Sequence, residues 1–516
     1  MTLLRSIATV GGLTMVSRVL GFVRDMLIAA VLGAGMVADA FVVAFRLPNL
    51  FRSLFAEGAF SAAFVPLFAE RLSRDGPAAA RAFSEQALSV LATTVLAFVL
   101  LMEALMPLAM HVFAPGFADE PAKFELAILL TRLTFPYLLF ISLASLMAGV
   151  LNSLGRFAAA AATPILLNLT LIAAVVGLAP LTPTPGHALA WGIAAAGAGQ
   201  FVWLLVGCAR AGMALRLRRP RLTPAVGVLL RRILPVAAGA GMYQVNLLIG
   251  TVIATLLPAG AISYLFYADR VAQLPLGVVG VAVGTALLPL ISRQLKSGDE
   301  AAAHHSQNRA VEVTCLLTLP AAAALMTIAE PVIAVLFERG AFGPRETAAT
   351  AAALRVFAAG LPAYVLIKAL IPAFFARDDT RTPIKIAAVA LIANVVLNLV
   401  LMGPLQHVGI AAAAVTAAWI NMIALAVVLH RRGHLRPDDR LRRRLPRTIA
   451  ATASMALALA AGQAGLAEML AGGLASRGTA LVLLVGGGLA VFGFFAKVLG
   501  AAEVADLRRL RRSATS

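Results

Sequence analysis

The stretch Ser17-Arg-Val-Leu-Gly-Phe-Val-Arg-Asp25 places two arginines and one aspartate inside a run that is otherwise largely apolar from Ser6 onward. A helix needs roughly 20 mostly apolar residues to cross a lipid bilayer, and this run is long enough. At mid-bilayer an arginine costs on the order of 2.5 to 3.5 kcal/mol on insertion scales, so such a residue normally faces water or a partner. The stretch therefore predicts a membrane helix whose charges serve a purpose.

Composition places the whole chain among polytopic membrane proteins. Of its 516 residues, 61% are hydrophobic and 13% are charged, and the mean hydropathy is +0.91. This balance is not that of a soluble protein. The formal net charge of +19 must be interpreted by position along the chain. The two cysteines, Cys208 and Cys315, lie in apolar segments without a ligand motif, so neither a disulfide nor a metal site is predicted.

Windows of about 20 residues separate the chain into candidate membrane spans. There are fourteen, beginning near Ser6, Val37, Ala87, Leu126, Ala158, Ala188, Val226, Ile262, Ala310, Ala349, Ile384, Val408, Arg447 and Gly478. If the N-terminus is cytoplasmic, the even-numbered spans lead into the basic loops, including seven arginines within 210–232 and eight within 431–447. Cytoplasmic loops are enriched in Lys and Arg, so both termini are predicted to be cytoplasmic. The same rule explains the basic loops without nucleic acid.

The two halves of the chain resemble each other weakly. Matching features are separated by 217 to 226 residues: Pro136 and Asn168 with Pro362 and Asn394, and Gly192-Ile-Ala-Ala with Gly409-Ile-Ala-Ala. This offset maps spans one to six onto seven to twelve, and an even number of spans per half gives a parallel pseudo-two-fold repeat. We therefore expect an N-terminal lobe over 1–222, a C-terminal lobe over 223–445, and spans thirteen and fourteen with a basic tail over 446–516.

Charged residues gather in spans one, two and eight. They are Arg18, Arg24, Asp25, Asp39, Arg46, Arg52, Glu57, Asp269 and Arg270, five basic against four acidic. Pairing among them leaves an excess of positive charge, which an anion would balance. Guanidinium groups stay protonated and bind phosphate oxygens in a bidentate manner, so a pyrophosphate ligand fits. Structural ion pairs, such as Arg24 with Asp39 or Arg46 with Glu57, remain the alternative.

At these residues the sequence resembles the MurJ (MviN) family of lipid II flippases, in the MATE-like and oligosaccharide-lipid exporter superfamily. The resemblance rests on residues 17–25, Ala38-Asp-Ala-Phe41, Arg46-Leu-Pro-Asn49, residues 52–60, Tyr267-Ala-Asp-Arg270 and Asp379-Thr-Arg-Thr-Pro383. It covers spans one to twelve, whereas spans thirteen and fourteen match only in number and character. One departure is Ala160, where the family carries a proline.

The resemblance implies a transporter and not an enzyme. Such a protein moves the undecaprenyl-pyrophosphate-linked disaccharide-pentapeptide from the cytoplasmic to the periplasmic leaflet of the bacterial inner membrane, for peptidoglycan synthesis. It works by alternating access through a cationic central cavity. Arg18, Arg24, Arg52 and Arg270 would contact the pyrophosphate, and Asp25, Asp39, Arg46, Glu57 and Asp269 would gate or pair with them. Membrane lipids and cell-wall synthesis proteins are the further partners to expect.

The energy source is left open by the sequence. The chain has no Walker motif, which argues against ATP hydrolysis. An anion that moves outward through an inside-negative potential of 100 mV gains about 2.3 kcal/mol per charge. Some relatives are thought to bind sodium in the second lobe, and Asn246, Asn394 and Asn398 could contribute ligands there. Interhelical hydrogen bonding is the simpler use of these asparagines. No other cofactor is expected.

Three rival functions agree less well with these residues. An O-antigen-type oligosaccharide-lipid flippase shares the pyrophosphate-polyprenol end of the ligand, and only the motif set argues against it. A cation-coupled drug antiporter would need mainly acidic cavity residues. A membrane glycosyltransferase would need a catalytic carboxylate in a sizeable outward loop, whereas the acidic loop at 119–125 is short and contains no histidine.

Overall fold

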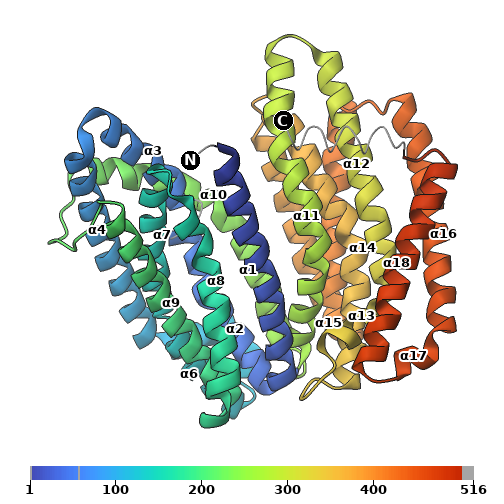
Figure 1. The fold of residues 1–516 in the computed structure, drawn as a ribbon, viewed down its shortest axis with the longest axis horizontal. Helices are drawn as coiled ribbons and strands as arrows, with labels where there is room; N and C mark the ends of the chain where they lie inside the picture. The colour runs from blue at the N-terminus through green and yellow to red at the C-terminus, as the bar shows by residue number, and fades with distance from the viewer. Residues whose placement is uncertain (1–2, 56–58, 503–516) are drawn as a thin grey trace. The chain divides into compact units, whose positions relative to one another are not determined.

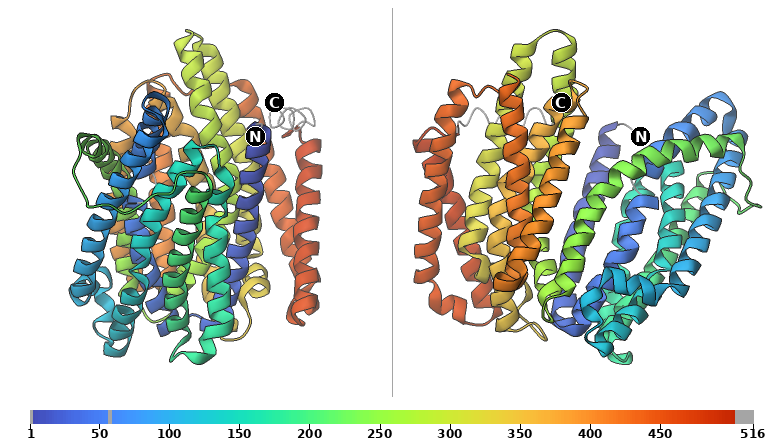
Figure 2. Two further views of the ribbon diagram at one scale, coloured as in Figure 1. Left: turned by 60° about the vertical axis from the view of Figure 1, so that its left-hand side comes forward. Right: turned by 180° about the vertical axis from the view of Figure 1, so that it is seen from behind.

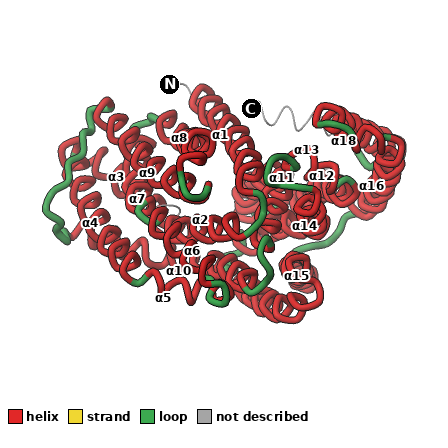
Figure 3. The backbone as a smooth tube through the Cα atoms, turned by 90° about the horizontal axis from the view of Figure 1, so that it is seen from below, coloured by secondary structure: helices red, strands yellow, loops and turns green. Residues whose placement is uncertain are grey.

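The computed structural model describes residues 3–55 and 59–502, and over these residues it is helical, with no β-strand (Figure 1, Figure 3). The helices of the first half are α1 (Leu3–Leu32), α2 (Met36–Phe55), α3 (Ala59–Arg74), α4 (Gly76–Ala104), α5 (Met106–Phe113), α6 (Pro121–Thr134), α7 (Tyr137–Ser153), α8 (Phe157–Ala173) and α9 (Pro185–Arg210). Those of the second half are α10 (Pro224–Thr255), α11 (Ala261–Lys296), α12 (Glu300–Thr327), α13 (Ala329–Phe337), α14 (Pro344–Phe375), α15 (Arg381–Arg431), α16 (Asp439–Gly465), α17 (Ala467–Ala471) and α18 (Leu474–Val498). Short 3-10 and π turns cover Pro115–Phe117 and Ala174–Leu181.

Each of the fourteen predicted spans begins within one of these helices, which confirms the all-α polytopic architecture. Within the described ranges, nine helices are long and apolar enough to cross a membrane. Many large apolar side chains on them are exposed, such as Leu100 (60%), Val202 (53%) and Leu489 (66%). An exterior of this kind belongs in lipid and not in water. The protein is a multi-pass membrane protein.

Helix breaks explain the difference between fourteen spans and the observed helices. The fourth span consists of α6 and α7, which meet at Pro136, a residue that cannot donate a backbone hydrogen bond. Spans eleven and twelve together form α15, whose 51 residues would extend about 77 Å if straight. Its backbone instead turns at Gln406 (φ 48°, ψ −130°), so α15 is two helices. Glu57, one of the predicted site residues, lies outside the described residues.

Packing divides the chain into two compact units. Unit 1 comprises Met1–Ser263 and Arg339–Phe342, and unit 2 comprises Tyr264–Glu338 and Gly343–Ser516. Within unit 1, α10 packs against α2, α3 and α4 (Figure 2). The last two spans, α16 and α18, pack on each other and on α12 and α13 within unit 2. The lobes predicted over 1–222 and 223–445 were defined by the sequence repeat and not by packing, so their boundaries stay a prediction.

Two glycines of the sequence repeat lie where helix backbones approach closely. A Cβ on Gly192 would stand 2.7 Å from the Cβ of Ala174, and one on Gly409 would stand 2.3 Å from the carbonyl oxygen of Leu401. Each site joins the fifth and sixth span of its half, where any larger side chain would force the two helices apart. This shared packing constraint supports the internal repeat.

A short hairpin from the second half of the chain packs in unit 1. Its Ala341 amide donates to the carbonyl oxygen of Ala30 near the end of α1, with N···O 2.8 Å. Gly33 (φ +64°) and Gly340 (φ +59°) make this approach possible, because a Cβ on Gly340 would lie 2.2 Å from that same carbonyl oxygen. The hairpin thus satisfies a carbonyl that the end of α1 leaves without an intrahelical partner.

Candidate functional site

Arg18 lies on the exposed side of α1. Its neighbours Met15 (64% exposed) and Val19 (57% exposed) share that exposure, so the cation sits on an otherwise apolar surface. Among the residues that the structure describes, Arg18 has no hydrogen-bond or ion-pair partner. Its five N–H donors are therefore available to a ligand in this conformation.

Arg24, one and a half turns further along α1, is buried and fully engaged. Its Nε and Nη2 donate to Oδ1 of Asp25 at 2.9 and 2.6 Å, and its Nη1 donates to Oδ1 of Asn168 on α8 at 2.8 Å. Consecutive residues of a helix point about 100° apart, but the long arginine side chain bends back to its neighbour Asp25. The alternative pair of Arg24 with Asp39 does not occur between these described residues. In this conformation Arg24 joins α1 to α8.

Asn168 is a site residue that the sequence marked only as part of the repeat. Besides accepting from Arg24, it donates through Nδ2 to the carbonyl oxygen of Ser17 at 2.9 Å. Gly21 lies against the same carboxamide, where an added Cβ would stand 3.4 Å from Nδ2. One buried asparagine thus holds both the backbone of α1 and its arginine. Only packing reveals this, because a single asparagine in an apolar run has no distinctive pattern.

Asp39 on α2 is 1% exposed and caps another helix. Its Oδ2 accepts from the Gly260 amide at 2.7 Å, and its Oδ1 accepts from the amide and the hydroxyl of Ser263 at 3.0 and 2.7 Å. These groups lie at the N-terminus of α11, where unpaired amides and the helix dipole favour a carboxylate. Asp39 therefore fixes the turn between α10 and α11 within unit 1.

Lys123 on α6 supplies the countercharge to Asp39. Its Nζ lies 3.5 Å from Oδ2 of Asp39 and 4.4 Å from the ring centroid of Phe117, and its side chain is 1% exposed. A second carboxylate, that of Glu120, lies 3.8 Å from Nζ. Sequence reasoning left Lys123 in an acidic outer loop. The missed signal was a lone lysine at the start of an apolar span.

The remaining charges of α2 contact neighbouring polar groups. Nη1 of Arg46 donates to the hydroxyl of Thr251 on α10, and Nε of Arg52 donates to Oδ1 of Asn49 at 3.0 Å. Both arginines are half-buried. Since Glu57 lies outside the described residues, the proposed pair of Arg46 with Glu57 stays a prediction.

In unit 2, Arg270 and Asp269 lie half-buried on α11. The Arg270 guanidinium lies over the ring of Phe266, 4.8 Å from its centroid, a cation–π arrangement that keeps the charge without neutralising it. Asp269 accepts a hydrogen bond from Nε2 of Gln273. Each charge of the eighth span therefore has a contact with another residue of α11.

The asparagines considered for a coupling ion are only partly described. Asn394 and Asn398 lie one turn apart on α15, and Nδ2 of Asn398 donates to Oδ1 of Asn394. The bond is within one helix, whereas an interhelical bond was expected. Oδ1 of Asn398 is buried without a described hydrogen-bond partner. The Asn246 side chain lies outside the described residues, and no group of three or more His, Cys, Asp or Glu suited to a metal occurs within them.

Two buried carboxylates near the charged helix ends were not predicted. Glu85 on α4 is 0% exposed and pairs with Arg81 and Arg218. Glu312 on α12 pairs with Arg309 and also with two arginines of α16, Arg440 and Arg444. The spacings Arg81–Glu85 and Arg309–Glu312, which bring side chains together on a helix, were the available signal.

The polar motif Asp379-Thr-Arg-Thr-Pro383 is held together by hydrogen bonds to the Asp379 carboxylate. Its carboxylate accepts from the amide of Thr382 at 3.0 Å and from Nη1 of Arg432 at 2.6 Å. Hydrogen bonds from Thr382, with those from Arg432, hold the pKa of this loop carboxyl below its usual range. The motif therefore ties the start of α15 to its end.

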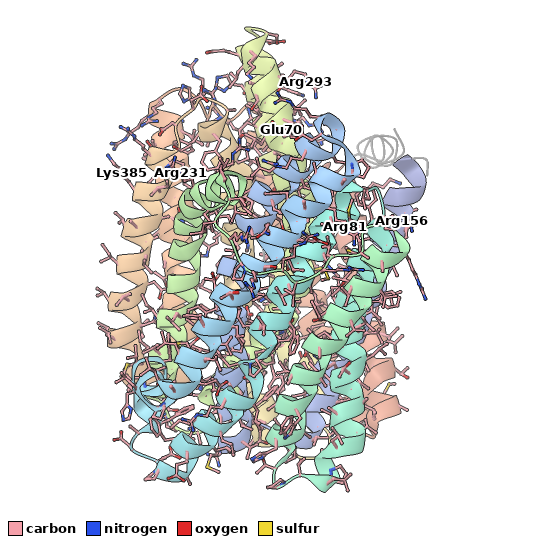
Figure 4. The ribbon with its side chains drawn as sticks, turned by 90° about the vertical axis from the view of Figure 1, so that its left-hand side faces the viewer. Glu70, Arg81, Arg156, Arg231, Arg293 and Lys385 are labelled. Carbon is pink, nitrogen blue, oxygen red and sulfur yellow. The ribbon has the colours of Figure 1, made fainter. Side chains whose placement is uncertain are left out.

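Basic residues gather at one end of each unit. In unit 1, Arg81, Arg156 and Arg231 lie towards the same end as Glu70, and in unit 2, Arg293 and Lys385 both lie towards one end (Figure 4). The basic segments 210–232 and 431–447 begin at the ends of α9 and α15 and run into the starts of α10 and α16. Such charge asymmetry is the usual marker of a membrane protein's orientation.

A family model described as "Lipid II flippase MurJ" matches residues 28–473. A probable lipid II flippase MurJ of Rhizobium meliloti is 47% identical over 524 aligned positions, covering 100% of this chain and 98% of the relative. The chain belongs to the lipid II flippase MurJ family. A second relative, the lipid II flippase MurJ of Burkholderia cenocepacia, is 38% identical and covers 85% of this chain and 86% of its own length.

Solved structures agree with this membership at the level of the fold. A MurJ structure titled as an inward closed conformation superposes with a TM-score of 0.78 at 23% identity, covering 95% of this chain and 98% of that one. A MATE family multidrug transporter in an inward-facing conformation gives a TM-score of 0.67 at 14% identity, covering 81% and 94%. The fold of this chain is thus similar to that of a MATE family transporter as well as to that of MurJ.

Proposed function

We propose that this chain is a lipid II flippase of the bacterial inner membrane. It moves the undecaprenyl-pyrophosphate-linked precursor of peptidoglycan from the cytoplasmic to the periplasmic leaflet. The observation that carries the proposal is the MurJ family match over residues 28–473, together with relatives of nearly full length that bear that name. The O-antigen-type and drug-antiporter alternatives have no comparable support.

The cations of the first, second and eighth spans have different tasks in this proposal. Arg18 is the first contact for the pyrophosphate, because it is exposed and has no described protein partner. Arg52 and Arg270 are half-buried cations that extend the positive path along their helices. Arg24 holds α1 against α8 in this conformation and reaches the substrate only if the Asp25 and Asn168 bonds are exchanged for phosphate oxygens.

Alternating access with the membrane potential as the driving force completes the proposal. The basic ends of both units are cytoplasmic, and so are the N- and C-termini. Outward movement of a pyrophosphate through an inside-negative potential is favourable by about 2.3 kcal/mol per charge and per 100 mV. The Asn394–Asn398 bond leaves one buried oxygen, which alone is too few ligands for a sodium site. A monovalent ion therefore needs further ligands, for which Asn246 is the candidate.

A complementation experiment tests this function. Bacteria depleted of their own flippase stop growing and accumulate lipid II, and expression of this chain is expected to restore growth and normal lipid II levels. The matched control is a strain lacking its O-antigen flippase, which the chain should not restore. If the inserted protein restores only O-antigen export, the substrate assignment is wrong.

A further inference from the structure

Residues 213–223, which we term the basic strap, connect α9 to α10 without regular secondary structure (Figure 1). Their sequence is Met-Ala-Leu-Arg-Leu-Arg-Arg-Pro-Arg-Leu-Thr, with arginines at 216, 218, 219 and 221. An orientation signal alone needs positive charge but no fixed conformation. The strap has both.

The inner edge of the strap is anchored to α4. Arg216 donates its amide to Oε1 of Glu85 at 3.3 Å, and Arg218 donates its amide to the hydroxyl of Ser89 at 2.8 Å. The Arg218 side chain also pairs with Glu85, which is 0% exposed. Met213 (4% exposed) and Leu215 (6% exposed) are buried beside these anchors. A buried carboxylate with these partners fixes the register of the strap, and so fixes which residues face outward.

The outer edge combines apolar and cationic side chains. Leu217 and Leu222 are 63% and 75% exposed, and the side chains of Arg219 and Arg221 are exposed between them. Glu85 is the carboxylate that contacts the strap, and it also pairs with Arg81, so the four arginines of the strap and Arg81 exceed it by a local charge of +4 (five minus one). The strap therefore presents more positive charge than its protein partners neutralise.

The position of the strap on α4 places it at the border of the apolar surface. Exposed apolar residues of α4 begin at Leu96 (44%) and continue with Leu100 and Leu101 (60% and 55%). Leu96 is seven residues beyond Ser89, or about 10 Å along the helix axis. On α9, the half-exposed Trp203 lies seven residues before the helix ends. A tryptophan near a span's end and a basic strap beyond it are typical of the membrane–water interface.

We propose that the basic strap binds the headgroups of anionic phospholipids in the leaflet that borders this end of unit 1. Arginines bind phosphate oxygens, and Leu217 and Leu222 can enter the acyl boundary beside them. Arg216 and Arg221 are about 16 Å apart along an extended chain, so the cations form a row that matches several headgroups and not one pyrophosphate. The inference goes beyond substrate transport and does not depend on it.

Lipid titration of the purified full-length chain tests the proposal. The probe is phosphatidylglycerol in mixed detergent micelles, with phosphatidylcholine as the reference lipid, and bound lipid is counted by native mass spectrometry. Each surface arginine contributes about five-fold in affinity, so R219Q/R221Q should bind phosphatidylglycerol roughly thirty-fold more weakly than the parent chain. The difference should shrink at high salt.

The matched control is R219K/R221K, which keeps both charges and should bind phosphatidylglycerol nearly as well as the parent. Three results would overturn the proposal. One is unchanged binding by R219Q/R221Q, and another is equal loss in the lysine variant, which would indicate a structural role. The third is displacement of phosphatidylglycerol from the strap by stoichiometric lipid II, which would make the strap a substrate site.

Discussion

Replacement of Asp39 by alanine is expected to destabilise unit 1 by about 3 to 5 kcal/mol, the range for breaking a buried ion pair. The change leaves Lys123 buried beside only the half-exposed Glu120, 3.8 Å away. It also removes the acceptor for the amides of Gly260 and Ser263 at the start of α11. The free energy of unfolding of a typical protein is about 5 to 15 kcal/mol, so a loss of about 3 to 5 kcal/mol would remove a large share of the stability.

The measurement is thermal unfolding of purified D39A in detergent. The protein that still elutes as a single species is determined after heating to each temperature. D39N keeps an oxygen acceptor but loses the charge, and it should fall between the parent and D39A. The double variant D39A/K123M removes the orphaned cation and should recover part of the loss, because the two residues are coupled. A melting temperature for D39A equal to that of the parent would show that Asp39 does not hold the α10–α11 turn.

Arg18→Ala is expected to reduce transport strongly while leaving the protein folded. The side chain is exposed and has no described partner, so its removal breaks no internal bond. Charge-assisted hydrogen bonds contribute about 1.5 to 3 kcal/mol, so losing one such contact to the pyrophosphate should reduce substrate affinity about 10- to 150-fold. The measurement is complementation of a flippase-depleted strain together with the level of the protein in membranes.

Met15→Ala provides the matched control, because it shortens an exposed side chain of α1 nearly one turn from Arg18 without changing charge. It should complement normally. Arg18→Lys keeps the charge but loses the planar fork that fits phosphate, and it should complement weakly. Full complementation by R18A would remove Arg18 from the substrate path.

The sequence predicted the helices well because apolar length and loop charge act locally. All fourteen predicted starting points lie in helices, and the prolines at 136 and 404 accompany a break and a turn. Local signals could not predict which unit α10 joins. That choice depends on packing against α2, α3 and α4, which only the structure shows.

The candidate site was predicted less completely than the fold. Residue types and helical spacing identified the charged set, but the partner of each charge depends on neighbouring helices. Arg24 binds its own neighbour Asp25 and a distant asparagine, and Asp39 binds a helix terminus and Lys123. Spacing along a single helix cannot reveal a partner more than one hundred residues away. The distinction between the exposed Arg18 and the engaged Arg24 therefore required the structure.

Lipid II movement in reconstituted vesicles tests the central claim most directly. The chain is inserted in vesicles containing labelled lipid II, a potassium gradient with valinomycin sets an inside-negative potential, and label reaching the outer leaflet is quenched over time. We predict movement well above the rate of protein-free vesicles, faster with the potential than without it, and strongly reduced with R18A. Movement of lipid II at the protein-free rate, with the chain folded and inserted in the predicted orientation, would contradict the account.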